Sequence, residues 1–281
     1  MLRNKAFSIT FSILVLGGCT PKRIKPFQQT NQVYQEKAKN YADTIAKVPP
    51  INVGNDSLNL PNEWVGTTNF NMRKPNMVII HHTAQNSCEQ TLRTFTLPRT
   101  QVSAHYVICK DGTIHHMLSD YLRAWHAGAS KWGNITDINS VSIGIELDNN
   151  GFEPFDTAQI NSLLQLLQKL KSNYQIPAAN FIGHGDIAPV RKNDPNIYFP
   201  WKMLSEKGFG LWYDEIATNQ TMPAQGLGFD NPLQALRIIG YDVKDTTAAK
   251  RAFKRHFLKD TATILTDTDK AVLNNLYKKY L

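Results

Sequence analysis

Two spacings of apolar residues divide most of the chain into predicted strands and predicted helices. Short runs rich in Val, Ile and Leu, some of them alternating with polar residues, predict the strands of a sheet. These runs cover residues 77–80, 104–110, 113–118, 140–148 and 180–187. Asp111 and Gly112 separate the second run from the third, and this dipeptide indicates a two-residue hairpin of type I′.

Leucine and isoleucine residues at helical spacing mark the second kind of element. They recur over residues 157–174, which predicts an amphipathic helix that begins near Asp156 or Thr157 and covers one face of the sheet. The other helical patterns lie after Gly228, over residues 231–239, 246–259 and 268–280. We therefore predict an α/β fold, with a mixed central β-sheet flanked by helices and followed by a small three-helix domain.

The first nineteen residues have the pattern of an export signal. Arg3 and Lys5 precede an apolar run over residues 6–16, which is too short to cross a bilayer as a helix. Two glycines then precede Cys19, which resembles a bacterial lipobox and implies cleavage before Cys19 and lipid attachment to it. The alternative is a plain signal peptide, or a short membrane anchor, with an incidental cysteine.

The segment after Cys19 is predicted to be a tether. Residues 20–61 are rich in Gln, Asn, Lys and Pro and have no sustained apolar period, although residues 34–48 could form a marginal helix. Thr20 stands where an aspartate would signal retention, so the resemblance to bacterial lipoproteins implies an outer-membrane location facing the periplasm, in a cell with two membranes.

Charge and cysteine content exclude some classes of protein. A net charge of +8 suits an anionic partner such as nucleic acid, a membrane surface or an acidic wall polymer, but export argues against nucleic acid. Three cysteines are too few for a disulfide-dense scaffold, and their spacing fits no CxxC zinc ribbon. Cys88 and Cys109 either pair in an oxidising compartment or stay separate as small buried residues.

Two histidines and a carboxylate form a candidate metal site. His81 ends an apolar strand, His184 lies in a second strand-to-loop exit, and Asp194 follows ten residues later. Two imidazoles and one carboxylate would leave a fourth zinc position for water, as in catalytic zinc sites. Asp186 competes with Asp194, because residues i and i+2 of an extended segment point the same way.

Four motifs carry a resemblance to a known family. They are VIIHHTA at 78–84, WHAG at 125–128, SIGIEL at 142–147, and GHGDIAP at 183–189 followed by RKNDP at 191–195. In this order they resemble the motifs of the type 2 N-acetylmuramoyl-L-alanine amidases, relatives of phage amidases and animal peptidoglycan recognition proteins. The resemblance covers about residues 62–205. Residues 233–236 and 252–257 are more weakly similar to the helical peptidoglycan-binding module of lipoprotein members.

The resemblance implies a zinc site and four further functional residues. It makes His81, His184 and Asp194 the zinc ligands, while strand alternation sends His82 to the opposite face. A separate set of residues takes part in the chemistry or contacts the substrate: Glu146 as general base, Lys192 as oxyanion partner, and Trp125 and His126 as substrate-binding residues. The alternatives are a solvent-facing Glu146, a solvated Lys192, and a buried Trp125 beside a hydrogen-bonded His126.

The implied function is zinc-dependent hydrolysis of the amide bond between N-acetylmuramic acid and L-alanine of peptidoglycan, in cell-wall turnover or remodelling. The alternative is a noncatalytic peptidoglycan-binding receptor of the same fold. The implied partners are peptidoglycan or muropeptides and, through the lipid anchor, a membrane; we expect a monomer. The predicted domains are a signal peptide (1–18), a lipid-anchored tether (19–61), a zinc amidase domain (62–222) and a helical peptidoglycan-binding domain (229–281).

Overall fold

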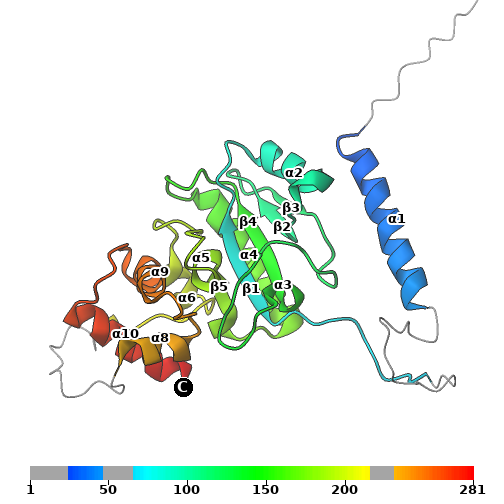
Figure 1. Cartoon of the computed structure of the whole chain (residues 1–281). Helices are drawn as coiled ribbons and strands as arrows, with labels where there is room; N and C mark the ends of the chain where they lie inside the picture. Colours follow the sequence, from blue (N-terminus) through cyan, green and yellow to red (C-terminus); the bar gives the residue numbers. More distant parts are fainter. Residues whose placement is uncertain (1–24, 47–65, 216–230) are drawn as a thin grey trace, which may run out of the picture. The chain divides into compact units, whose positions relative to one another are not determined.

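The computed structural model describes residues 25–46, 66–215 and 231–281 and divides the chain into two units, Met1–Thr68 and Asn69–Leu281 (Figure 1). The predicted signal peptide and Cys19 lie outside the described residues. The first unit contains helix α1 (Gln28–Ile45), which begins earlier than the predicted marginal helix and buries none of its residues. Among the described residues, no helix is long and apolar enough to cross a membrane.

Five strands of the second unit form one mixed sheet, as predicted. The strands are β1 (Met77–His82), β2 (Tyr106–Ile108), β3 (Ile114–His116), β4 (Ser142–Leu147) and β5 (Phe181–Gly183). Their spatial order is β3-β2-β4-β1-β5, in which β1 pairs in parallel with β4 and β5, and β2 pairs in parallel with β4 and antiparallel with β3. The central strand β1 is buried along its whole length, which explains its continuous apolar run.

The hairpin between β2 and β3 has a different turn from the predicted one. A type I′ turn needs a positive φ at both central residues, but Gly112 has a φ of 87° while Asp111 does not have a positive φ. The backbone N–H of Gly112 donates to the carbonyl of Cys109, and the carboxylate of Asp111 accepts from the N–H of Thr113. The type I′ prediction is therefore wrong, because this local side-chain hydrogen bond favours a longer turn.

Each face of the sheet is covered by helices. Helix α4 (Thr157–Tyr174) has the predicted bounds, and its leucines bury Val78 and Ile80 on one face. The other face, which includes Met77 and Ile79, belongs to a hydrophobic cluster with the three C-terminal helices. These helices are α8 (Pro232–Ile239), α9 (Thr246–Leu258) and α10 (Asp267–Tyr280), each within two residues of its predicted bounds.

Short helices lie in the connections between the strands and after β5. They are α2 (Cys88–Thr96), the 3-10 helix η1 (Pro98–Thr100), α3 (Ile138–Val141), the 3-10 helix η2 (Ala178–Asn180), α5 (His184–Ile187) and α6 (Trp201–Glu206). The strand predicted over 180–187 therefore ends at Gly183 and continues as α5.

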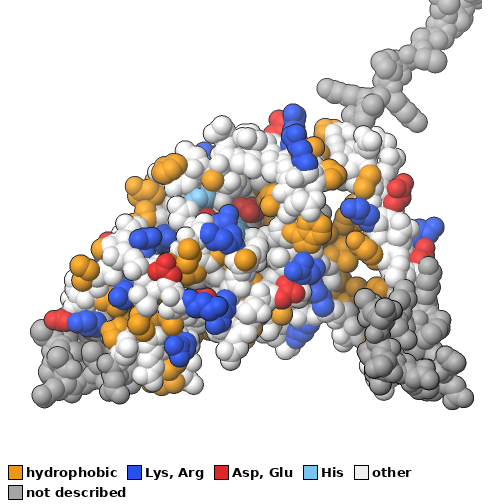
Figure 2. Space-filling model, viewed as in Figure 1, with side chains coloured by type: hydrophobic (Ala, Val, Ile, Leu, Met, Phe, Trp, Pro, Cys, Tyr) orange, Lys and Arg blue, Asp and Glu red, His pale blue; other side chains and the backbone are white. Residues whose placement is uncertain are grey.

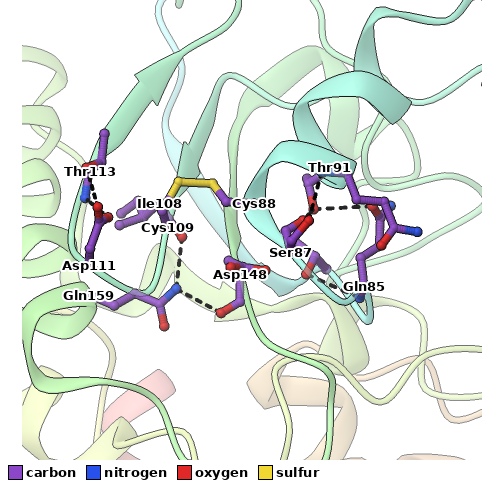
Figure 3. Close-up of a disulfide and its surroundings, with 12 residues drawn as sticks. Gln85, Ser87, Cys88, Thr91, Ile108, Cys109, Asp111, Thr113, Asp148 and Gln159 are labelled. Carbon is purple, nitrogen blue, oxygen red and sulfur yellow. Dashed lines mark hydrogen bonds between the residues drawn. A yellow bond between two sulfur atoms is a disulfide. The ribbon is translucent and has the colours of Figure 1, made fainter.

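A disulfide between Cys88 and Cys109 joins the start of α2 to the chain just after β2 (Figure 3). Of the two alternatives left open by the sequence, the structure has the paired one. In the same region Gln159 of α4 donates to the backbone carbonyls of Ile108 and Asp148, so β2, β4 and α4 are tied together beside the disulfide.

Candidate active site

His81, His184 and Asp194 meet where β1 and β5 end. His81 is the second-last residue of β1, His184 begins α5, and Asp194 lies in the loop that follows. The two Nδ1 atoms are 2.9 Å apart, and Asp194 Oδ2 lies 3.1 Å from His81 Nδ1 and 3.0 Å from His184 Nδ1. All three side chains are buried. Parallel strands bring their carboxyl ends to one edge, so residues 113 positions apart become neighbours.

Hydrogen bonds on the far side of the two imidazoles determine which nitrogen of each ring faces Asp194. Ser142 donates its hydroxyl to the carbonyl of Ile138, so its oxygen accepts from His126 Nε2. His126 Nδ1, 3.1 Å from His81 Nε2, then accepts from that nitrogen. His184 Nε2 donates to the carbonyl of Ala127. Both His81 and His184 are thereby assigned the tautomer whose Nδ1 lone pair faces the other ring and Asp194.

These charges fit a cation. Burial, together with the neighbouring His184, lowers the pKa of His81 to about 4, so that ring is neutral. Burial alone would raise the pKa of Asp194, but His184 and His81 hold it well below its usual range. Two lone pairs and one carboxylate therefore converge on one point. Tetrahedral zinc with bonds of about 2.0–2.1 Å would need ligand atoms roughly 3.3 Å apart, close to the separations observed.

Asp186, the competing ligand, belongs to a different set of contacts. Its Oδ2 accepts from the N–H of Gly183 and lies 2.7 Å from His256 Nδ1, while its Oδ1 accepts from the hydroxyl of Tyr241. Burial would raise the pKa of Asp186, but the charge and hydrogen bond of His256 lower it below the usual value. The described residues therefore bring Asp194, rather than Asp186, to the two histidines.

Glu146 lies directly beside the histidine pair. It is the register partner of His81 on β4, and its Oε1 is 3.9 Å from His81 Nδ1. Burial and the nearby Asp194 raise the pKa of Glu146 to about 8, although Lys192 opposes the shift. Its buried Oε2 makes no hydrogen bond to the protein. A carboxylate held this way is a candidate for moving a proton.

A cavity of about 310 Å³ opens onto these groups. Figure 2 shows histidine and carboxylate surfaces in a hollow of this face, next to Lys and Arg side chains. Lys192 and Trp125 line the cavity, and Trp125 is 49% exposed. His126 also lines it, but it is buried behind His81. Its placement supports a role in holding His81, and a direct contact with substrate stays a prediction.

Other cavity residues have no counterpart in the sequence predictions. Helix α2 contributes Thr91, Thr94 and Phe95, and the chain before Trp125 contributes Val102. His82 lines the cavity as well, and its ring lies against Gly151. The alternation expected to send it to the opposite face from His81 is present in β1, where Met77 and Ile79 belong to one hydrophobic cluster and Val78 and Ile80 to the other. The N-cap Ser87, whose hydroxyl accepts from the N–H of Gln90, was the local signal for α2.

Comparisons with known proteins agree with this geometry. Residues 71–197 match the family described as N-acetylmuramoyl-L-alanine amidase, Amidase_2. The chain is 34% identical over 231 residues to N-acetylmuramoyl-L-alanine amidase AmiD of Escherichia coli, covering 73% of this chain and 83% of the relative. The chain belongs to the N-acetylmuramoyl-L-alanine amidase family. It is an enzyme of that activity, a hydrolase in peptidoglycan turnover.

Further members of the amidase family match parts of the chain or its whole fold. The 1,6-anhydro-N-acetylmuramyl-L-alanine amidase AmpD of Haemophilus influenzae is 40% identical over 103 residues, which are 36% of this chain and 56% of that protein. The structure of Escherichia coli AmiD with the substrate anhydro-N-acetylmuramic acid-L-Ala-D-γ-Glu-L-Lys has a TM-score of 0.66 at 30% identity, covering 81% of this chain and 97% of that one. AmpDh3 of Pseudomonas aeruginosa with anhydromuramic pentapeptide has a TM-score of 0.67 at 28% identity, covering 80% and 99%.

Proposed function

We propose that the protein is a zinc-dependent amidase that cleaves peptidoglycan or its muropeptides at the outer membrane, held there by a lipid on Cys19. The observation that carries the zinc assignment is the convergence of two Nδ1 lone pairs and one carboxylate oxygen within 2.9–3.1 Å of one another. Zinc, when bound, lowers the pKa of a coordinated water to about 7 and polarises the scissile carbonyl.

The residues around the proposed metal ligands take distinct roles. Glu146 accepts the proton of the attacking water at a carboxylate oxygen and passes it to the leaving amine of L-alanine. A divalent cation beside Glu146 would lower its pKa below about 8, so that the carboxylate is ionised near neutral pH. Lys192, which lines the cavity, stabilises negative charge on the carbonyl oxygen, and exposed Trp125 offers an aromatic face to sugar or peptide.

Muropeptides are the proposed substrates because two structural neighbours hold them. The solved structures of AmiD and AmpDh3 contain anhydromuramic peptides. The net charge of +8 suits an acidic wall polymer as well as its soluble fragments. Both intact sacculus and anhydro-muropeptide should therefore be tested as substrates. The ratio of their cleavage rates shows which one the enzyme prefers.

The decisive experiment is mass spectrometry of digestion products from zinc-loaded and chelated protein. Zinc-loaded wild type should release peptides that begin with L-alanine, and chelation should stop the release. His184→Ala should lose both zinc and cleavage, whereas the control His116→Ala should keep both, because His116 lies outside the cavity and outside the groups of described residues that could hold a metal ion. Binding of peptidoglycan without cleavage by zinc-loaded protein would instead support the noncatalytic receptor.

The lipid anchor is proposed from the sequence pattern around Cys19 and is tested by cell fractionation. The monomeric state is a separate proposal, which sedimentation tests. Cys19→Ala should move the protein from the membrane fraction to the soluble periplasm and leave its activity on purified peptidoglycan nearly unchanged. Retention of the variant in membranes after a high-salt wash would contradict the lipid anchor. Sedimentation of the mature protein should give the mass of a single chain.

A further inference from the structure

The C-terminal helices reach the back of the loop that carries two proposed metal ligands. His256 of α9 lies 2.7 Å through Nδ1 from Asp186 Oδ2, and the hydroxyl of Tyr241 donates to Asp186 Oδ1 at 2.9 Å. All three side chains are buried, and His256 also stacks on Trp201 with ring centroids 4.0 Å apart. Asp186 is two residues after His184 on α5. These contacts join α9 to the ligand-bearing segment, and Figure 1 shows α9 beside α5.

A second contact of α9 reaches Gly185, the residue after His184. The guanidinium of Arg255 lies against Gly185 so closely that a Cβ at this glycine would collide with it. The N–H of Gly185 donates to the backbone carbonyl of Asp194 at 2.6 Å, which links the two ligand segments directly. Arg255 and Asp194 also line one small cavity of about 10 Å³, roughly the space of one water molecule.

The buried polar residues of α9 divide into two groups by their partners. Lys254 is buried but pairs with Asp260 and Asp269, both within the C-terminal segment. Arg255 and His256 instead face the amidase segment, where their neighbours are Gly185 and Asp186. Packing of the apolar residues of α9 would not require buried polar contacts with this loop.

We propose that His256 and Tyr241 are positioning residues of the metal centre, which hold Asp186 and thereby α5 and the following loop, the segment that carries His184 and Asp194. The inference rests on the proposed zinc site. A buried carboxylate that loses a partner is left uncompensated, so the segment that carries it rearranges. Groups that orient metal ligands commonly change metal affinity by about 10- to 100-fold when removed. The C-terminal helices are then part of the catalytic unit, in addition to any contact that they make with the wall.

The test measures the zinc dissociation constant of the full mature chain by competition with a chromogenic chelator. His256→Ala should weaken zinc binding by about 10- to 100-fold. Tyr241→Phe, which removes one hydroxyl and keeps the ring, should weaken it less. His256→Asn places an amide donor near the position of Nδ1 and should recover part of the loss. The absorption spectrum of Co²⁺-substituted protein should shift in His256→Ala, since the ligands are less well held.

The matched control is Lys254→Gln, which changes a buried polar residue on the same helix with no contact to the ligand loop. It should leave zinc affinity within about threefold, even where it lowers thermal stability. Equal zinc affinity in wild type, His256→Ala and Tyr241→Phe would overturn the proposal, as would an equal loss in Lys254→Gln. A wild type that binds no zinc would instead refute the proposed metal site. His184→Ala, which should bind none, verifies the assay.

Discussion

Replacing Glu146 by Gln should remove turnover while making the metal-free protein more stable. Burial raises the pKa of Glu146 from 4.5 to about 8, so the folded protein binds a proton there that the unfolded chain releases at lower pH. The free-energy cost of the ionised carboxylate therefore grows as the pH rises from about 4.5 to 8 and is constant above that. Gln has the shape of the neutral acid and avoids this cost at every pH.

The size of the effect follows from the same shift. At about 1.4 kcal/mol per pKa unit, the cost approaches roughly 5 kcal/mol above pH 8 and is about 3 kcal/mol at pH 7. A folded unit of this size gains roughly 2–4 °C in Tm for each kcal/mol. Metal-free Glu146→Gln should thus melt roughly 10 °C or more above wild type at pH 8, with the difference vanishing near pH 4. Loss of a general base should lower kcat/KM by about 10²- to 10⁴-fold.

The assay compares melting of metal-free protein between pH 4 and pH 9 with hydrolysis by zinc-loaded protein of verified metal content. Glu153→Gln is the control, because Glu153 is a partly exposed carboxylate that pairs with Lys110 outside the cavity. It should change Tm by no more than about 2 °C and leave kcat/KM unchanged. A metal-free Glu146→Gln protein that melts below wild type at pH 8 would refute the burial argument. Near-normal turnover would refute the role of Glu146 as base.

Three further predictions concern the fold. Because the Cys88–Cys109 bond joins residues 21 positions apart, replacing both cysteines by Ala should cost about 3 kcal/mol in chemical denaturation, and unreduced denatured protein should show no thiol from this pair. A hydrogen bond to Asp120 raises the pKa of His116, so His116→Gln should lower the free energy of unfolding at pH 5 by up to about 1 kcal/mol. This difference should shrink as the pH rises above about 6.5. A larger difference at pH 9 than at pH 5 would contradict the pairing. Leu167 of α4 is fully buried, so Leu167→Ala should cost about 2–5 kcal/mol in urea unfolding without changing kcat/KM at 25 °C.

Local patterns were sufficient for most of the elements. The apolar run of β1 predicted a buried strand that carries His81, and the leucine spacing predicted the bounds of α4. Both elements form because apolar periodicity decides which side chains can leave water together, and that periodicity is visible in a few neighbouring residues. The turn at Asp111 shows the limit of such patterns, since the Asp111 side chain accepts two hydrogen bonds from Thr113 and the turn is not the predicted type.

The proposed zinc ligands could be selected from the sequence only with help from the resemblance to a family. Residue chemistry left Asp186 and Asp194 both open, because each follows His184 at a short distance along the chain. The structure separates them through partners far away in sequence: Asp186 contacts Tyr241 and His256, which are 55 and 70 positions away. A local sequence pattern does not contain the information about which distant residues each carboxylate contacts.

The sequence by itself therefore determined the strands, the long helices and the residue types of the metal site, because these depend on apolar spacing and on the chemistry of short motifs. Only the tertiary structure decided the tautomer of His81, the burial of His126 behind it, and the contact of α9 with the ligand loop. Each of these depends on hydrogen bonds between segments that are distant in the chain, such as His81 with His126 and Asp186 with His256. Packing of the two faces of the sheet brings those segments together, and a one-dimensional pattern carries no record of it.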